Sequence, residues 1–152
     1  MRDRLSTRLW ILVSLFVSFE TKAAYNSQDI MNYANSEQTL FQISDWISSP
    51  KGYKAESPLM WFSFIVGENV SQISSPYINP KQKREAQARC ESLASHILKP
   101  STEQTIQLAK VIHRATQFHI PRSISMNSVR FDIAPTMEGV YVKLICTFSK
   151  LP

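Results

Sequence analysis

Apolar residues in the first third of the chain recur at helical spacing. Between residues 27 and 47 they lie three, seven, three and four positions apart, which marks one face of an amphipathic helix; they are Ile30, Tyr33, Leu40, Ile43 and Ile47. Ser27 is a suitable N-cap, and Pro50 and Gly52 are residues that end a helix. We therefore predict a helix from about residue 27 to residue 47.

The next apolar segment, residues 59–66, fits two kinds of element. It follows Ser57-Pro58, a cap and a proline at the first helical position, which favours a buried helix. We therefore predict a buried helix, although the aromatic and β-branched residues also suit a central strand. Residues 71–77 are polar and contain Pro76, so we predict a connection there.

Two further helices have clear start signals. Asn79-Pro80 repeats the pattern of a cap followed by proline, and we predict a helix from there to about Pro100. Ser101 and Gln104 form a capping-box pattern that opens the next helix. The apolar residues that mark the inner faces are Ala86, Cys90, Leu93, Ala94 and Ile97 in the first, and Leu108, Ala109, Ile112 and Ala115 in the second.

The apolar period changes to two after Pro121, which predicts β-structure. Two alternating runs are separated by turn residues at 135–139, as in two antiparallel strands. The inward residues are Val129, Phe131 and Ile133 in the first run, and Val140, Val142, Leu144, Cys146 and Phe148 in the second.

The predicted fold is therefore α+β, with about four helices packed on a small C-terminal antiparallel hairpin or sheet. A hairpin alone is marginally stable. Either residues 59–70 supply a third strand, or the hairpin rests on the helices and leaves a free edge. The length is that of one domain.

The N-terminus has the layout of a secretory signal. Three arginines in the first eight residues precede an apolar run over residues 9–19 and a small-residue exit at Ala23 and Ala24. The run has eleven residues, whereas about 20 are needed to span a bilayer. We expect a signal peptide over residues 1–23, cut after Ala23 or Ala24, and a periplasmic or secreted domain over 24–152 without a membrane span. An uncleaved signal anchor is the alternative.

The two cysteines indicate a disulfide. An exported chain folds in an oxidising compartment, where an even number of cysteines is typical of paired thiols. Cys90 lies on the inner face of its helix and Cys146 on the inner face of its strand. We predict a Cys90–Cys146 bridge.

Removing the signal also changes the charge. The whole chain carries a net +5. Without residues 1–23, 13 basic and 10 acidic residues remain, a net charge of +3. The high pI therefore overstates how basic the mature domain is, and we expect no nucleic-acid partner.

Two groups of residues are candidates for binding a partner. Lys81, Lys83, Arg84 and Arg89 crowd the start of one helix, where positive charges oppose the helix dipole. They form either a solvated helix face or a docking site for an acidic protein, anionic headgroups or a phosphate-rich polymer. The outer side of the last strand carries Tyr141, Lys143, Ile145 and Thr147. This side is more apolar than a fully hydrated one and could be covered by the chain itself or receive a partner by edge pairing.

No catalytic, cofactor or metal motif stands out. Cys90 and His96 are six helical positions apart and so lie on different faces. His96, His113 and His119 lack the spacing of zinc-binding helices, so we expect surface or capping histidines and no cofactor or metal.

These features favour a non-enzymatic, exported protein-binding domain, an inhibitor or immunity protein acting on a cell-envelope enzyme or toxin. The first alternative is an accessory subunit of an envelope secretion, pilus or conjugation assembly. The second is a small secreted hydrolase without a recognisable motif. Self-association remains open.

Overall fold

The fold was analysed in a computed structural model that describes residues 25–43, 45–57 and 61–152. These residues form three helices and seven strands, and the strands make one sheet in which all neighbours are antiparallel. The strand order is β1-β2-β3-β4-β7-β6-β5. The elements are α1 (Ser27–Ser36), β1 (Ile47–Ser49), β2 (Gly52–Ser57), β3 (Phe62–Val66), β4 (Val70–Tyr77), α2 (Pro80–Leu98), α3 (Thr102–Phe118), β5 (Arg122–Met126), β6 (Val129–Glu138) and β7 (Tyr141–Lys150).

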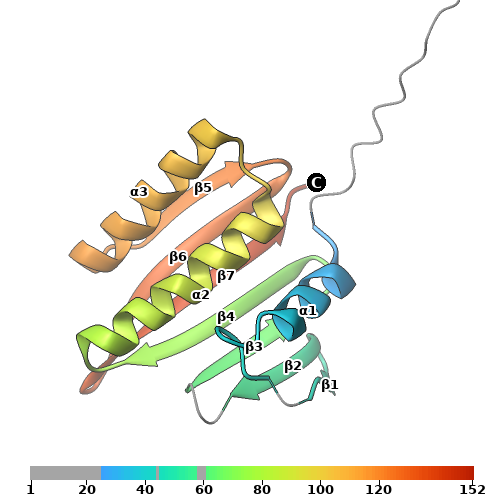
Figure 1. Ribbon diagram of the computed structural model, residues 1–152, viewed down its shortest axis with the longest axis horizontal. Helices are drawn as coiled ribbons and strands as arrows, with labels where there is room; N and C mark the ends of the chain where they lie inside the picture. The colour runs from blue at the N-terminus through green and yellow to red at the C-terminus, as the bar shows by residue number, and fades with distance from the viewer. Residues whose placement is uncertain (1–24, 44, 58–60) are drawn as a thin grey trace, which may run out of the picture.

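The three helices all lie on one face of the sheet (Figure 1). The core fills the space between the two layers and is centred on four fully buried phenylalanines, Phe41, Phe64, Phe131 and Phe148. The opposite face of the sheet has no helix over it within the described part of the chain. The α+β class is confirmed, with a larger sheet and fewer helices than predicted.

The two central helices begin where the sequence indicates. The Asn79 side chain accepts a hydrogen bond from the Gln82 amide, and Pro80 occupies the first turn of α2. Ser101 and Gln104 form both hydrogen bonds of a capping box at the start of α3. Both predicted helices are confirmed. At α1 the N-cap is Asn26, one residue before the expected Ser27.

The prediction of one helix over residues 27–47 is wrong beyond Ser36. The backbone turns at Glu37, whose carbonyl accepts from the amides of Leu40 and Phe41. Phe41 and Ile43 are nevertheless buried. Phe41 lies outside the predicted helical face, and Ile47, its last member, is 69% exposed. Beyond Ser36 the helical spacing therefore does not describe which side chains are buried.

The second half of the predicted helix over residues 59–66 is strand β3, whereas residues 59 and 60 lie outside the described residues. The predicted connection over 71–77 is also wrong, because it forms β4. Its inward positions include Ser71 and Ser75, which are fully buried. Buried and less buried positions therefore alternate along β4, whereas apolar and polar residues do not. Strands β2 and β5 were not predicted.

The two predicted C-terminal strands are present as β6 and β7, but they belong to a seven-stranded sheet and are not a small hairpin with a free edge. The turn predicted at residues 135–139 is wrong because β6 continues to Glu138, and Val140, which was predicted to face inward, is 93% exposed. Strand β7 pairs with β6 on one side and with β4 on the other. Edge pairing of a partner along Tyr141 to Thr147 is therefore excluded. The strands at the two ends of the sheet are β1 and β5.

The Cys90–Cys146 disulfide is confirmed and ties α2 to β7, with Cα atoms 6.0 Å apart. Both half-cystines are fully buried. The bridge encloses a sequence separation of 56 residues. The expected signal peptide and its cleavage sites fall on residues 1–24, outside the described residues. No helix in the described ranges is long and apolar enough to cross a membrane.

Candidate partner-binding surface

Several chain connections meet at the end of the molecule where α2 begins. Tyr77, the last residue of β4, pairs with Val142 near the start of β7, and α2 starts three residues later. A hydrogen bond from Gln87 to Thr116 joins the early part of α2 to the last turns of α3. The β4–α2 connection, the β6–β7 turn and the C-terminus of α3 consequently share this end (left in Figure 1).

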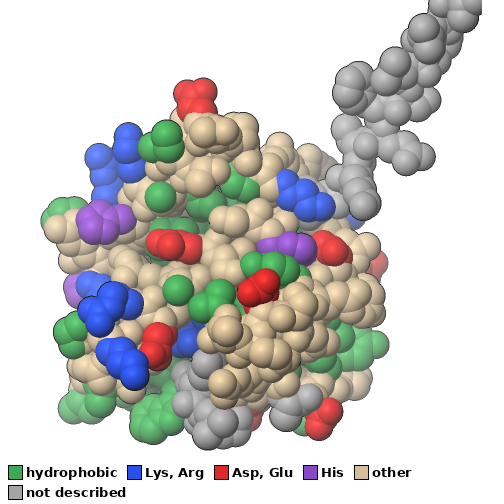
Figure 2. Space-filling view, viewed as in Figure 1, with side chains coloured by type: hydrophobic (Ala, Val, Ile, Leu, Met, Phe, Trp, Pro, Cys, Tyr) green, Lys and Arg blue, Asp and Glu red, His purple; other side chains and the backbone are tan. Residues whose placement is uncertain are grey.

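Large apolar side chains are exposed at this end. Val140, in the β6–β7 turn, is 93% exposed, and Ile78, between β4 and α2, is 64% exposed. Green apolar and blue basic side chains alternate here in the space-filling view (Figure 2). We call this surface the apolar-basic end; it comprises Ile78, Lys81, Lys83, Arg84, Phe118, Ile120, Met137 and Val140.

The basic residues of this surface are not neutralised within the chain. Lys81 and Arg84 are exposed and Lys83 is half-exposed. None of the four ion pairs among the described residues involves them. Their charge is therefore available to an external anion.

Arg89 does not belong to this surface, contrary to the expectation from sequence. Its side chain is 2% exposed. Its Nε donates to the Ser75 hydroxyl at 3.2 Å, and its guanidinium lies 4.9 Å from the centre of the Phe62 ring. Burial lowers the pKa of Arg89, and the charge of Glu85 opposes this effect. Arg89 instead packs α2 onto β3 and β4.

Tyr141 and Lys143 form a small hydrogen-bonded group with Glu138. The Tyr141 hydroxyl donates to one carboxylate oxygen at 2.8 Å, and the Lys143 ammonium donates to the other at 2.7 Å. These hydrogen bonds lower the pKa of Glu138 and raise the pKa of both donors. Lys143 therefore stays protonated at neutral pH, which suits a binding role and not that of a general base.

An apolar hollow of about 240 Å³ lies where the start of α2 meets β7. Gln82 contributes from α2 and Tyr141 from β7. The remaining lining residues are Trp61, Pro76, Tyr77 and Ile78. Of the candidate residues from the sequence, only Tyr141 lines this hollow, and none of the four basic residues of α2 does.

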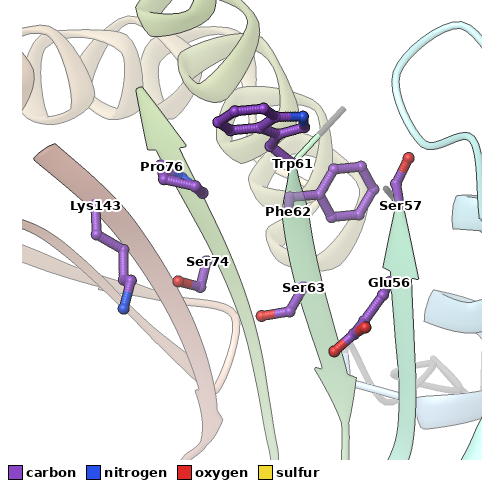
Figure 3. A pocket seen from close by; sticks show the side chains of 8 residues that line it. All are labelled: Glu56, Ser57, Trp61, Phe62, Ser63, Ser74, Pro76 and Lys143. Atoms are coloured by element: carbon purple, nitrogen blue, oxygen red, sulfur yellow. The ribbon is translucent and has the colours of Figure 1, made fainter. Parts of the chain in front are cut away.

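A second, shallower hollow of about 410 Å³ lies on the helix-free face of the sheet. Figure 3 shows Trp61 at one end, Ser63 and Ser74 on its floor, and Glu56 and Lys143 on opposite sides. Ile145 is half-buried on this face, opposite Ser74 of β4 and Ala134 of β6. Ile145 therefore belongs to the sheet face, and neither hollow contains it.

Sequence reasoning missed the apolar part of the surface. Ile78 directly precedes the N-cap of α2, a position whose apolar residue usually packs against the fourth helical residue. That residue is Lys83. Because Lys83 is not apolar, the sequence could have predicted that Ile78 lacks this packing and is exposed. Trp61 gave no comparable signal; its φ of 55° is a left-handed conformation that sequence did not indicate.

Two of the three histidines, His96 and His119, occupy structural positions, whereas His113 is exposed on α3. The Nε2 atom of His96 lies 2.9 Å from a carboxylate oxygen of Asp29, and its ring stacks on that of Tyr33 with the ring centres 3.9 Å apart. These contacts join α2 to α1. His119 is the C-cap of α3 in the left-handed conformation. Cys90 is in the disulfide and so cannot act with His96. The described residues contain no group of three or more possible metal ligands.

Comparisons with protein-family models, with curated proteins and with solved structures found no match for this chain.

Proposed function

We propose that this protein is an exported, non-enzymatic protein-binding domain that docks an acidic partner at its apolar-basic end. One observation carries the proposal: exposed apolar side chains and unneutralised bases share the same end of the molecule. Exposed apolar groups with a polar rim are typical of interaction sites. Unneutralised bases add electrostatic steering toward an acidic surface.

Folding alone does not account for this arrangement. Positive charges in the first turn of a helix oppose its dipole, at a cost of a few tenths of a kcal/mol or more each. The first turn of α2 contains no acidic residue. Exposed apolar residues such as Ile78 and Val140 also gain nothing from the core. Both features become favourable when an acidic partner with an apolar centre covers them.

An inhibitor or immunity protein fits this chemistry, because occlusion of an enzyme or toxin requires complementary shape and charge and no catalytic group. The protonated ammonium of Lys143 and the structural roles of the histidines agree with this proposal. The partner would be a cell-envelope enzyme or a delivered toxin with an acidic surface.

The test compares two charge reversals of equal size. Lys83→Glu with Arg84→Glu alters the apolar-basic end, and Lys51→Glu with Lys150→Glu alters exposed bases at the other end of the sheet. A partner is first captured from envelope extract at low salt and purified. We expect the first pair to reduce the association rate constant about tenfold or more, to flatten its salt dependence, and to change stability by no more than about 0.5 kcal/mol.

The control pair should bind at the wild-type rate. Equal rates for all three proteins would contradict the proposal. So would binding of the wild type to vesicles of anionic lipid with no affinity for any acidic protein.

A further inference from the structure

We propose that two copies of this chain pair through the free edge of strand β5, so that their sheets join across a two-fold axis. The inference is independent of the proposed function, because it uses no residue of the apolar-basic end. The contact would be made by main-chain hydrogen bonds, as in other pairings of exposed sheet edges.

The two edges of the sheet differ in how well they are protected. Strand β1 has only three residues, and a short edge strand offers few groups for pairing. Strand β5 has five residues, runs beside β6 without a break in register, and contains neither proline nor lysine. Within the described residues no strand lies on its outer side, and Figure 1 shows it at the border of the sheet with α3 over it. The edge of β5 is therefore open to pairing.

The turn between β5 and β6 determines which backbone groups of β5 point outward. Its two central residues, Asn127 and Ser128, both have positive φ, 51° and 61°, as in a type I′ turn. Met126 and Val129 close this turn, and the closing pair exchanges both of its backbone hydrogen bonds. Hydrogen-bonded and non-hydrogen-bonded pairs then alternate along the strands. Every second residue of β5, counted from the one before Met126, therefore directs its amide and carbonyl away from β6.

The residues with outward backbone groups are Ser125 and Ser123. In the described part of the chain, their amides and carbonyls form no hydrogen bond with any segment beyond β6. Both residues are exposed, so a second strand can reach these groups. Unpaired donors and acceptors along an edge are a template for another strand.

The edge of β5 is complementary to a second copy of itself. Ser123 and Ser125 lie one on each side of Ile124, so an antiparallel second β5 places Ser125 of each chain opposite Ser123 of the other. Each of these pairs can exchange both backbone hydrogen bonds. Ile124 then meets its counterpart on the two-fold axis, as in an isologous interface. Arg122, the only charged residue of β5, lies opposite Met126 of the second copy, so no like charges face each other.

Apolar side chains at the same border of the molecule would be covered by the second copy. Thr116 of α3 is hydrogen-bonded to Gln87 of α2. Val111 precedes Thr116 by five positions, a rotation of about 140° around the helix, and so faces away from α2. Val111 and Ile124 are both only partly buried against the core. Pairing along β5 would bury more of each.

The charges of α3 do not oppose this contact. Lys110 and Arg114 are exposed and lie two positions before and after Ile112, which is fully buried. Two helical positions correspond to a rotation of about 200°, so both side chains point away from the sheet. Two neighbouring copies of α3 therefore bring no like charges together beside β5.

Sedimentation velocity of the exported protein over a range of concentrations tests the pairing. We expect a dimer that dissociates on dilution. Ser125→Pro removes an outward amide hydrogen and no hydrogen bond to β6, and should raise the dissociation constant of the dimer at least about tenfold. Far-UV circular dichroism should show the wild-type fold.

The matched control is Ser48→Pro at the other edge of the sheet. Ser49 lies opposite Gly52 next to the β1–β2 turn, so the amide of the neighbouring Ser48 points outward as that of Ser125 does. This variant should dimerise as the wild type does. A dimer that is weakened by Ser48→Pro and not by Ser125→Pro would overturn the inference.

Cysteine cross-linking tests the register without a proline. In the proposed dimer Ile124 faces its counterpart as a non-hydrogen-bonded pair with Cα atoms about 4.5 Å apart, within the range of a disulfide. Ile124→Cys should therefore give a covalent dimer on a non-reducing gel. Ser125→Cys should give none, because each introduced thiol would lie opposite Ser123.

Three further results would overturn the inference. One is a wild-type protein that remains monomeric up to about 100 μM, a concentration at which even a weak specific dimer forms. Another is a dimer whose affinity Ser125→Pro leaves unchanged. The third is a covalent dimer from Ser125→Cys with none from Ile124→Cys. A monomer whose binding to the captured partner still depends on Lys83 and Arg84 would refute the dimer and leave the proposed function intact.

Discussion

The helix-free sheet face and the apolar-basic end differ in whether their charged side chains form ion pairs within the chain. On the sheet face, Lys54 pairs with Glu56, Arg130 with Asp132, and Lys143 with Glu138. At the apolar-basic end, none of the ion pairs in the described ranges includes Lys81, Lys83 or Arg84. The charges of the sheet face are therefore balanced within the chain. We propose that those of the apolar-basic end, together with its exposed apolar groups, are covered by a partner.

The largest expected effect concerns the disulfide that ties α2 to β7 beneath both regions. Replacing both Cys90 and Cys146 with alanine should reduce the free energy of unfolding by about 4 kcal/mol, because the unfolded chain regains the freedom of a long loop. Urea denaturation followed by circular dichroism measures this loss. A loss below about 1 kcal/mol would show that the attachment of α2 to the sheet does not depend on the bridge.

A smaller change in stability is expected when a charge that is paired within the chain is removed. Burial by itself would raise the pKa of Asp132, but hydrogen bonds from Arg130 and Ser123 and the guanidinium charge together lower it. Its contribution to stability is therefore present above the ordinary pKa of aspartate and is lost as the pH falls through the lowered value. Arg130→Gln should lower the unfolding temperature at pH 7 and leave it unchanged at pH 2.

The matched control for this experiment is Lys83→Gln, which removes a charge from the apolar-basic end. It should leave the unfolding temperature unchanged or raise it slightly at either pH, since no ion pair within the chain is lost and a charge that opposes the helix dipole is removed. If Lys83→Gln destabilised the protein as much as Arg130→Gln, the contrast between the two regions would be unfounded.

The smallest expected effect is a change in the pKa of Tyr141, which lies between the sheet face and the apolar-basic end. The hydrogen bond to Glu138, followed by its negative charge, raises the pKa of Tyr141. Glu138→Gln removes the charge and should return the pKa of Tyr141 toward its ordinary value. The measurement is the phenolate absorbance as a function of pH, taken as the difference between variant and wild type. Identical titration curves would show that Tyr141 and Glu138 do not interact in solution.

Local signals explain which parts of the fold could be predicted. The starts of α2 and α3 depend on neighbouring residues such as Asn79 and Ser101. Strands β6 and β7 each contain a run in which apolar and polar residues alternate. Strand β4 could not be found in this way. Its buried serines hydrogen-bond to distant residues, Ser71 to Tyr25 and Ser75 to Arg89.

Only the basic part of the candidate surface could be predicted from the sequence. The cluster of bases at the start of α2 is contiguous in sequence and was identified. Its apolar neighbours come from three separate connections that only the sheet topology brings together. Arg89 was misplaced because its sequence neighbours are basic, whereas its position on the helix faces β3 and β4.

Site-specific photo-cross-linking tests the central claim most directly. Benzoylphenylalanine is placed at Val140, on the apolar-basic end, or at Glu56, on the sheet face, and the exporting cells are irradiated. We predict a cross-linked adduct with one acidic protein from position 140 and none from position 56. An adduct from position 56 alone would contradict the account and assign partner binding to the sheet face.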